Sequence, residues 1–347
     1  MAMNNNLYLR ISLDTIKSNI RKLTKQLPYR SSLFMVCKNN VYGFGMSLLS
    51  HLANENLSFV LNDWRDYQRF VQIVRDSKPV LILYPVLNDD PWILTQLGEH
   101  SNLYITVMKK EDWAFVLRKG YEAKSYVRID PFLGLHGLSK EEAMSLPKVH
   151  ACKGVLIHLN ESINAKEEAV INEIYQWTKK NNMSMNIGGS NIINKPNLHF
   201  PFLEVRLLME LLGSRNRVTE PCLELHARIL SKTLIREPIH VGYTSSRVKL
   251  SKGTCLLVAI GYGDFPSFAQ MFENQTPIFI ERKKFVLPCY PCMNTSWLYC
   301  EEEVFIRRES IVLFDKFNSI HKLALNLSVD VDEIYSSLSP LIYRHYV

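Results

Sequence analysis

The sequence lacks the marks of membrane, secreted and nucleic-acid-binding proteins. Its longest wholly apolar run, Pro79–Leu87, is about half as long as a membrane-spanning helix. The first six residues, MAMNNN, have neither the basic nor the apolar region of a signal peptide. Lys and Arg exceed Asp and Glu only by 41 to 34, and no basic block resembles a nucleic-acid-binding arm. We therefore expect a cytoplasmic protein that binds neither a membrane nor nucleic acid.

Cysteine is scarce and scattered. An odd set of seven cysteines is typical of free thiols in a reducing compartment. Cys289 and Cys292 form one CxxC pair with Cys300 nearby, but no second pair follows at the spacing of a zinc finger. We interpret these three as strand cysteines beside a turn, and we expect no metal site.

Eight short apolar runs dominate the first two thirds of the chain. Each has about seven residues, the size of a buried parallel strand, and segments with helical periodicity lie between them. The runs are Ser32–Lys38, Leu57–Asp63, Pro79–Pro85, Asn102–Met108, Lys124–Asp130, Lys153–Leu159, Met183–Gly189 and Phe202–Leu208. Eight such units are what a (β/α)8 barrel of the TIM type requires.

The pattern changes after about residue 220, where strand-like runs follow one another without long helices. A length of 347 residues, at about 150 per domain, also suggests two domains. We therefore expect an α/β fold with a (β/α)8 barrel over residues 1–222 and a mainly antiparallel β domain over residues 223–347. The predicted elements of the second domain are Leu223–Ile235, Thr254–Gly261, Pro277–Glu281, Trp297–Arg307 and Ile311–Phe314 as strands, with Ser319–Leu327 and Val331–Leu338 as helices.

A lysine stands at the end of the first predicted barrel strand, where barrel enzymes keep their catalytic groups. Its segment, Met35–Gly45, reads MVCKNNVYGFG. An isolated Lys38 would more often be a loop residue, but a lysine at a barrel mouth can also attack a carbonyl and form a Schiff base. The segment resembles the lysine motif of alanine racemases, VKANAYGHG. The resemblance implies that Lys38 carries pyridoxal 5′-phosphate and that Tyr42 contacts its phosphate.

The resemblance to alanine racemases continues along the barrel strands. Gly188–Asn191 reads GGSN, a plain turn by itself, and its Ser190 matches the family serine that contacts the phosphate. His158 matches the histidine that packs near the cofactor ring. Arg206 lies in an apolar strand, so it needs a partner. It is either half of a structural ion pair or, as the resemblance implies, the arginine that hydrogen-bonds the pyridine nitrogen.

The second domain carries further segments of the family pattern. Tyr243 matches the catalytic tyrosine, which the resemblance assigns to the partner subunit of a head-to-tail homodimer with shared active sites. Lys38 and Tyr243 would then exchange a proton with the two faces of an amino acid. Tyr262 matches a tyrosine at the substrate entrance, and Met293 matches a methionine whose backbone amide holds the substrate carboxylate. The last residues, YRHY, resemble the closing Arg-x-Tyr of the family.

Several positions depart from the family pattern. In the segment Val127–Gly137, VRIDPFLGLHG, the family lysine becomes Arg128 and the arginine that binds the substrate carboxylate becomes Leu135. Leucine cannot replace a bidentate guanidinium, so Arg128 is the candidate substitute for substrate binding. Three supporting residues also differ from the family, at Asn186, Asn294 and Asp332.

The resemblance implies an isomerase that interconverts L-alanine and D-alanine, an activity associated with cell wall biosynthesis. The departures support a second hypothesis, a pyridoxal-phosphate-binding paralogue with altered substrate or little activity and a binding or regulatory role. A third hypothesis is an anion-binding barrel without a cofactor. The sequence leaves open which amino acid is preferred.

Overall fold

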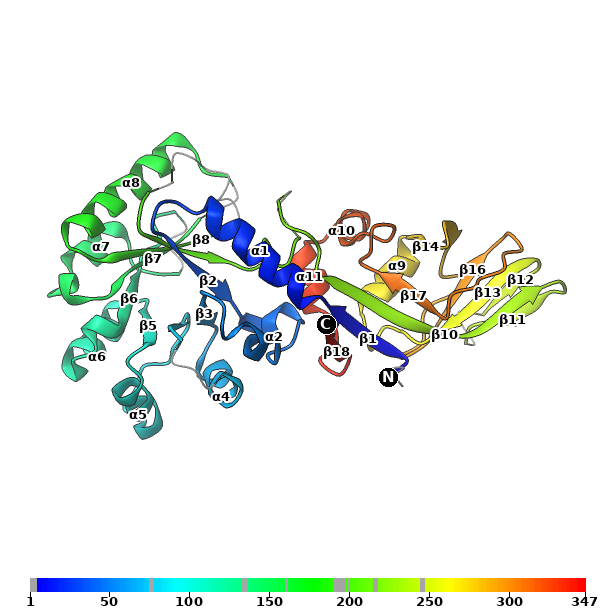
Figure 1. Cartoon of the computed structure of the whole chain (residues 1–347), viewed down its shortest axis with the longest axis horizontal. Coiled ribbons are helices and arrows are strands. Elements are labelled where there is room, and N and C mark those ends of the chain that lie inside the picture. The colour runs from blue at the N-terminus through cyan, green and yellow to red at the C-terminus, as the bar shows by residue number, and fades with distance from the viewer. Residues whose placement is uncertain are drawn as a thin grey trace. The chain divides into compact units, whose positions relative to one another are not determined.

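The computed structural model describes residues 5–74, 78–132, 136–159, 162–189, 192, 198, 200–214, 218–243 and 247–347. The chain forms two compact units, coloured along the sequence in Figure 1. The barrel unit comprises Lys17–Val41 and Met46–Thr219, and the β unit comprises Met1–Ile16, Tyr42–Gly45 and Glu220–Val347. The first residues and the short segment after the candidate lysine therefore group with the β unit, whereas the sequence analysis placed all of residues 1–222 in the barrel.

Eight parallel strands close into a barrel, and each lies within one of the eight predicted apolar runs. The predicted fold class is confirmed. The strands are β2 (Ser32–Val36), β3 (Ser58–Leu61), β4 (Val80–Ile82), β5 (Leu103–Val107), β6 (Ser125–Arg128), β7 (Gly154–His158), β8 (Ser184–Gly188) and β9 (Leu203–Leu207). These strands appear in the sequence as continuous apolar runs because a parallel strand that is covered by helices is buried on both faces.

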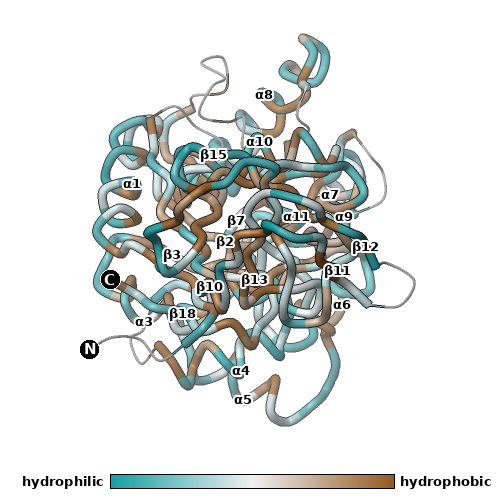
Figure 2. Tube along the Cα trace, turned by 90° about the vertical axis from the view of Figure 1, so that its right-hand side faces the viewer, coloured by the Kyte–Doolittle hydropathy of each residue, from teal (hydrophilic) through white to brown (hydrophobic). Residues whose placement is uncertain are grey.

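Helices connect the barrel strands. They are α1 (Leu13–Gln26), α2 (Lys38–Tyr42), α3 (Leu48–Leu52), α4 (Trp64–Ile73), α5 (Pro91–Glu99), α6 (Lys110–Lys119), α7 (Lys140–Ser145) and α8 (Ala165–Lys180), with 3-10 turns at Glu122–Lys124 and Val149–Ala151. Figure 2 shows the turns of α1 alternating between hydrophobic and hydrophilic residues, as expected of a helix with one buried face.

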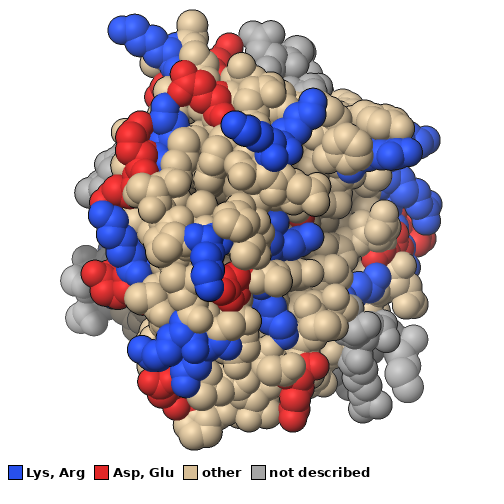
Figure 3. Space-filling model, turned by 90° about the vertical axis from the view of Figure 1, so that its left-hand side faces the viewer, with Lys and Arg blue, Asp and Glu red and all other residues tan. Residues whose placement is uncertain are grey.

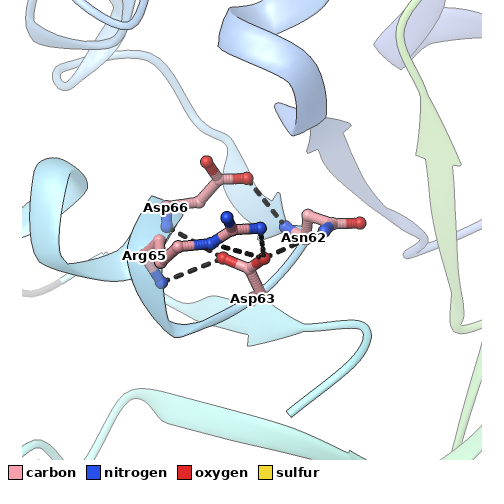
Figure 4. Close-up of polar contacts among 4 residues, drawn as sticks. All are labelled: Asn62, Asp63, Arg65 and Asp66. Atoms are coloured by element: carbon pink, nitrogen blue, oxygen red, sulfur yellow. Dashed lines mark hydrogen bonds and ion pairs between the residues drawn. The ribbon is translucent and has the colours of Figure 1, made fainter.

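Local capping decides where these helices begin, as α4 illustrates. The Asp63 carboxylate accepts the backbone N–H groups of Arg65 at 2.9 Å and of Asp66 at 3.2 Å (Figure 4). The Arg65 guanidinium binds the same carboxylate at 2.8 Å, and Asp66 accepts the backbone N–H of Asn62 at 3.3 Å. Asp63 thus provides acceptors for amides that the first turn of a helix leaves unpaired.

An apolar layer fills the barrel interior. Its buried members come from five different strands, and further partly buried side chains pack against them. The buried members are Phe34, Val60, Leu81, Tyr126 and Leu156. This layer supports the side chains that lie nearer the carboxyl ends of the strands, where a barrel of this type carries its site.

A six-stranded sheet is the centre of the β unit, with the order β16-β13-β10-β1-β18 and with β17 paired to β10. The long strand β10 spans the predicted residues, Leu223–Ile235, and β1 pairs with it in antiparallel register. The other strands are β1 (Leu7–Ile11), β11 (Ile239–Val241), β12 (Val248–Leu250), β13 (Gly253–Val258), β14 (Ile278–Ile280), β15 (Lys283–Phe285), β16 (Ser296–Cys300), β17 (Ser310–Leu313) and β18 (Tyr343–Tyr346). The helices are α9 (Ser267–Glu273), α10 (Ile320–Leu327) and α11 (Val331–Ser336).

The surface and the cysteines have ordinary structural roles. Basic and acidic side chains are interspersed on the face shown in Figure 3. Exposed ion pairs such as Lys110–Glu142, at 3.0 Å, contribute little to stability because water screens them.

All seven cysteines are free thiols, and all but Cys292 are buried. Among the described residues, no helix is long and apolar enough to cross a membrane.

Candidate active site

Lys38 directly follows strand β2 and the buried Cys37, and its side chain is exposed. Burial raises the pKa of the Cys37 thiol far above its ordinary value, and its Sγ donates to the carbonyl of Met35 at 3.2 Å. A thiol held in its protonated form is a poor nucleophile. Of these two neighbouring residues, the lysine is therefore the one suited to nucleophilic chemistry.

The backbone after Lys38 is left-handed over four consecutive residues, so the element labelled α2 is a left-handed turn and not a right-handed α-helix. Asn39, Asn40, Val41 and Tyr42 have φ values of 50°, 54°, 56° and 49°. Each such residue costs about 1–2 kcal/mol, and β-branched valine tolerates this region least. The Asn40 side chain supports the turn by accepting the backbone N–H of Met46 at 3.0 Å. Strain of this kind collects at functional sites, where surrounding contacts hold a segment in place.

Contacts within the β unit hold the end of this segment. The Arg344 guanidinium donates to the Gly43 carbonyl at 2.8 and 3.1 Å, and the Tyr346 hydroxyl donates to the Phe44 carbonyl at 2.8 Å. Gly43 has a φ of +83°, and a Cβ there would lie 2.3 Å from the Tyr335 carbonyl oxygen. The closing Arg-x-Tyr of the sequence therefore clamps the last residues of the lysine motif.

Arg206 lies on β9 and is buried, with its guanidinium held by the two preceding strands. One Nη donates to the Ile157 carbonyl at 2.6 Å, and the other donates to the backbone and side-chain oxygens of Asn186. The guanidinium also occupies the space that a Cβ at Gly188 would need, 2.5 Å from Nη2. Burial, with a contribution from Arg128, lowers the pKa of Arg206 to about 9. The arginine is thus still protonated near neutral pH.

His158 ends β7 among several charged side chains. Part of its surface is open to solvent, but the surrounding barrel mouth buries enough of the ring to lower its pKa to about 4. Positive charges on Arg206, Arg128 and Lys38 add to this decrease, and Asp130 acts in the opposite direction. The imidazole is therefore neutral at pH 7. The carboxyl ends of four barrel strands thus bring the neutral ring of His158 together with three cations, Lys38, Arg128 and Arg206.

Arg128 ends β6, and its side chain is buried. Its Nη1 donates to the Tyr84 hydroxyl at 3.2 Å, and its guanidinium carbon lies 5.5 Å from the centre of the Tyr84 ring. The Tyr84 contact, which sequence reasoning missed, fixes Arg128 within the barrel mouth. Leu135 and Ser190, two other residues of the predicted site, lie outside the described residues.

The β unit brings together the segments of Tyr262 and Met293. The backbone N–H of Tyr262 donates to the Cys292 carbonyl at 3.1 Å, and that of Gly263 donates to the Met293 carbonyl at 2.8 Å. Asn294, one of the departures, donates to the Asp264 carboxylate at 3.0 Å. The Met293 side chain is 59% exposed.

Two further residues named from the sequence also lie in the β unit. Tyr243 follows β11, and 72% of its surface is exposed. Asp332 lies in the first turn of α11 and is partly buried.

Comparisons with known proteins agree on one family. No protein-family model matches the chain. The alanine racemase of Vesicomyosocius okutanii subsp. Calyptogena okutanii is 22% identical over 289 residues, and the match covers 78% of each chain. The sequence is therefore similar to an alanine racemase at low identity.

Solved alanine racemases share the fold over the whole chain. A structure from Bartonella henselae with covalently bound pyridoxal phosphate has a TM-score of 0.82 and 17% identity, covering 99% of this chain and 100% of that one. The enzyme from E. faecalis has a TM-score of 0.81 and 18% identity, with complete coverage of both chains. The chain has the fold of the alanine racemases.

The neutral state of His158 predicts a distinctive titration. We expect its ring protons to titrate near pH 4 in NMR spectra, below the ordinary value of 6.5. The unfolded chain binds this proton at about pH 6.5 and the folded chain only at about pH 4. The histidine therefore lowers the free energy of unfolding as the pH decreases from about 6.5 to 4. Arg128→Gln should raise the midpoint because it removes a positive charge, and Asp130→Asn should lower it further. A wild-type midpoint near 6.5 would contradict the description of the cationic mouth.

The clamp on the lysine segment predicts a cost for any side chain at Gly43. Gly43→Ala should destabilise the β unit by more than about 2 kcal/mol in urea unfolding, because the methyl group meets the Tyr335 carbonyl. Gly120→Ala is the matched control, since Gly120 has a φ of +71° with nothing within 4 Å of the added Cβ. It should show only the cost of the left-handed backbone, about 1–2 kcal/mol. Equal losses in the two variants would refute a steric clamp.

Proposed function

We propose that the protein is a pyridoxal-phosphate-dependent isomerase, a racemase that interconverts L-alanine and D-alanine. The observation that carries the proposal is the convergence of Lys38, His158 and Arg206 at the carboxyl ends of the barrel strands. These are the residues that the sequence resemblance named independently. The whole-chain likeness to alanine racemases supports the same assignment.

The residues of the barrel mouth fit the proposed cofactor. A phosphate monoester carries a charge of about −2 at neutral pH, and the cations Lys38, Arg128 and Arg206 give the mouth as a whole a positive potential that suits an anionic ligand. An exposed lysine amine suits a covalent bond to the aldehyde. Arg206 would donate to the pyridine nitrogen, and Tyr42 and Ser190 would contact the phosphate. When bound, the cofactor supplies an electron sink for a carbanion at the substrate α-carbon.

The proton transfers require two groups on opposite faces of the substrate. We assign Lys38 to one face and the partner subunit's Tyr243 to the other. In this assignment one group removes the α-proton and the other returns a proton to the opposite face. Because Arg206 remains protonated, it does not give up a proton to the ring nitrogen, and this limits side reactions. Met293 and Tyr262 would line the substrate entrance in the head-to-tail homodimer.

A second candidate is a relative that binds the cofactor but prefers another amino acid or turns it over slowly. The observation that favours it is the contact of Arg128 with Tyr84. Arg128 is the last residue of β6 and precedes position 135 by seven residues, so a substrate carboxylate bound by Arg128 would be held differently from one bound by the family arginine. Activity with L-alanine against a panel of other amino acids separates the two candidates.

Cofactor binding at Lys38 is directly measurable. Purified protein incubated with pyridoxal 5′-phosphate should acquire the absorbance band of covalently bound cofactor. Borohydride reduction should then leave the cofactor's mass on the peptide that contains Lys38. The variant Lys38→Ala should lose both signals, and Lys153→Ala, which removes a lysine before β7, should keep them. Absence of the band in the loaded wild-type protein would rule out the proposed function.

Shared active sites are testable by mixing two inactive variants. Lys38→Ala and Tyr243→Phe should each abolish racemisation, because each removes one of the two proton-transfer groups. In randomly mixed dimers half the molecules are hybrids with one intact site of two, so about a quarter of the wild-type activity should return. Recovery is measured as D-alanine formed after joint refolding. No recovery would refute a site built from two subunits.

A further inference from the structure

A buried carboxylate lies beside Arg206 inside the barrel. Glu204 precedes Arg206 by two residues on β9, so the two side chains share one face of the strand. Glu204 is only 9% exposed. Its Oε2 accepts the Tyr126 hydroxyl at 2.8 Å and the Asn186 side-chain Nδ2 at 3.1 Å. None of the roles proposed above uses this residue.

Strand register places one amide between the two charged groups. On the neighbouring strands β8 and β9, Asn186 pairs with Glu204, and Gly188 pairs with Arg206. The Asn186 Nδ2 donates to Glu204, while its Oδ1 accepts from Arg206. The absent side chain at Gly188 leaves room for the guanidinium to reach this amide.

The two contacts allow only one orientation of the Asn186 amide. A carboxamide has donors at its nitrogen and acceptors at its oxygen, and a guanidinium only donates. A reversed amide would turn its NH2 group toward the Arg206 donors and its oxygen toward the Glu204 carboxylate. Both contacts would then be repulsive. Glu204 therefore selects the orientation in which the amide oxygen receives Arg206.

Tyr126 holds the carboxylate from the other side. Its ring is fully buried in the apolar layer of the barrel, and its hydroxyl donates to Glu204. Burial, with a contribution from the nearby Glu204, raises the pKa of Tyr126 well above its ordinary value, so the hydroxyl remains a donor. The carboxylate is thus fixed by one donor from β6 and one from β8.

We propose that Glu204 is a positioning residue, which acts through Asn186 to hold the Arg206 guanidinium in the orientation that the cofactor ring requires. The inference rests on the proposed function for its ligand, but the arrangement of the three side chains stands without it. In the part of the chain that the structure describes, no carboxylate binds Arg206 directly, and Asn186 joins the two opposite charges. A chain of hydrogen bonds in a buried site polarises its members and strengthens each contact.

A ligand that lacks the ring nitrogen distinguishes a role of Glu204 in positioning Arg206 from a general role in stabilising the barrel mouth. The two probes are pyridoxal 5′-phosphate and its analogue in which C–H replaces the ring nitrogen, and affinity is measured by absorbance titration. Glu204→Leu should weaken binding of pyridoxal 5′-phosphate about tenfold, because Arg206 loses its fixed orientation. Binding of the analogue should be unchanged. Glu204→Gln keeps an oxygen that can accept from Asn186, so it should retain most of the affinity.

A second measurement needs no cofactor. In protein labelled with 15N-arginine, the two Nη groups of Arg206 should give separate NMR signals, because each is held by different acceptors and rotates slowly. Glu204→Leu should average these signals, and Glu204→Gln should leave them separate. Tyr126→Phe is the matched control, since it removes the other donor to Glu204 and leaves Asn186 in contact. Circular dichroism identifies any variant that fails to fold, and if Glu204→Leu does so, Glu204→Ala, which also removes the acceptor for the Asn186 amide, takes its place.

The outcomes separate this inference from the proposed function. If the wild type binds both probes and Glu204→Leu weakens them equally, or weakens neither, Glu204 does not position Arg206 and the inference fails. Unaltered Arg206 signals in Glu204→Leu would overturn it as well. If the wild type does not bind pyridoxal 5′-phosphate, the proposed function fails, and so does the cofactor-directed role, while the NMR measurement still decides whether Glu204 orients the guanidinium.

Discussion

The burial of the Arg206 charge is the constraint on which the barrel mouth depends. An unpaired ion in a protein interior is costly, so the surrounding strands have to supply acceptors. They do so with the Ile157 carbonyl of β7 and the two oxygens of Asn186 in β8. The same demand requires Gly188 to have no side chain. The charge in turn affects its neighbours, since it helps to keep His158 neutral.

The strained segment after Lys38 is the second constraint. Four left-handed residues in succession are held only if other contacts outweigh their cost, and the chain provides such contacts within the segment and directly after it. The Asn40 side chain binds Met46 within the barrel unit, and Arg344 and Tyr346 bind the carbonyls of Gly43 and Phe44 within the β unit. A segment with this support presents Lys38 on a defined backbone, as a precise site requires.

Much of the fold was predictable from the sequence. All eight barrel strands lie within predicted runs, because a strand that is buried on both faces consists of consecutive apolar residues. The strand β1 was not predicted. Its main partner, β10, is more than 200 positions away in sequence, and β1 stands before the repeat of barrel units. The grouping of Met1–Ile16 with the β unit follows from this long-range pairing, which no local pattern indicates.

The candidate site was predictable only where a motif carried it. Lys38 and Arg206 were named from the sequence, and the structure gives Arg206 its needed partners. Tyr84 and Glu204 were missed, because a tyrosine after a strand and a glutamate within one have no sequence signal of their own. The significance of Glu204 depends on strand register, which brings it opposite Asn186. That of Tyr84 depends on its side-chain contact with Arg128, which comes from a strand that does not pair with β4.

The same register suggests a reason for one departure from the family pattern. The resemblance indicates a histidine where this chain has Asn186, and an imidazole can support an arginine with either ring nitrogen and can change its charge with pH. An amide does not titrate, but it can be turned end for end, so it needs a second group that selects one orientation. Glu204 lies directly across the strand pair and selects the orientation with the oxygen toward Arg206. The substitution and the buried carboxylate are then two parts of one arrangement, in which a side chain that does not titrate supports the buried arginine.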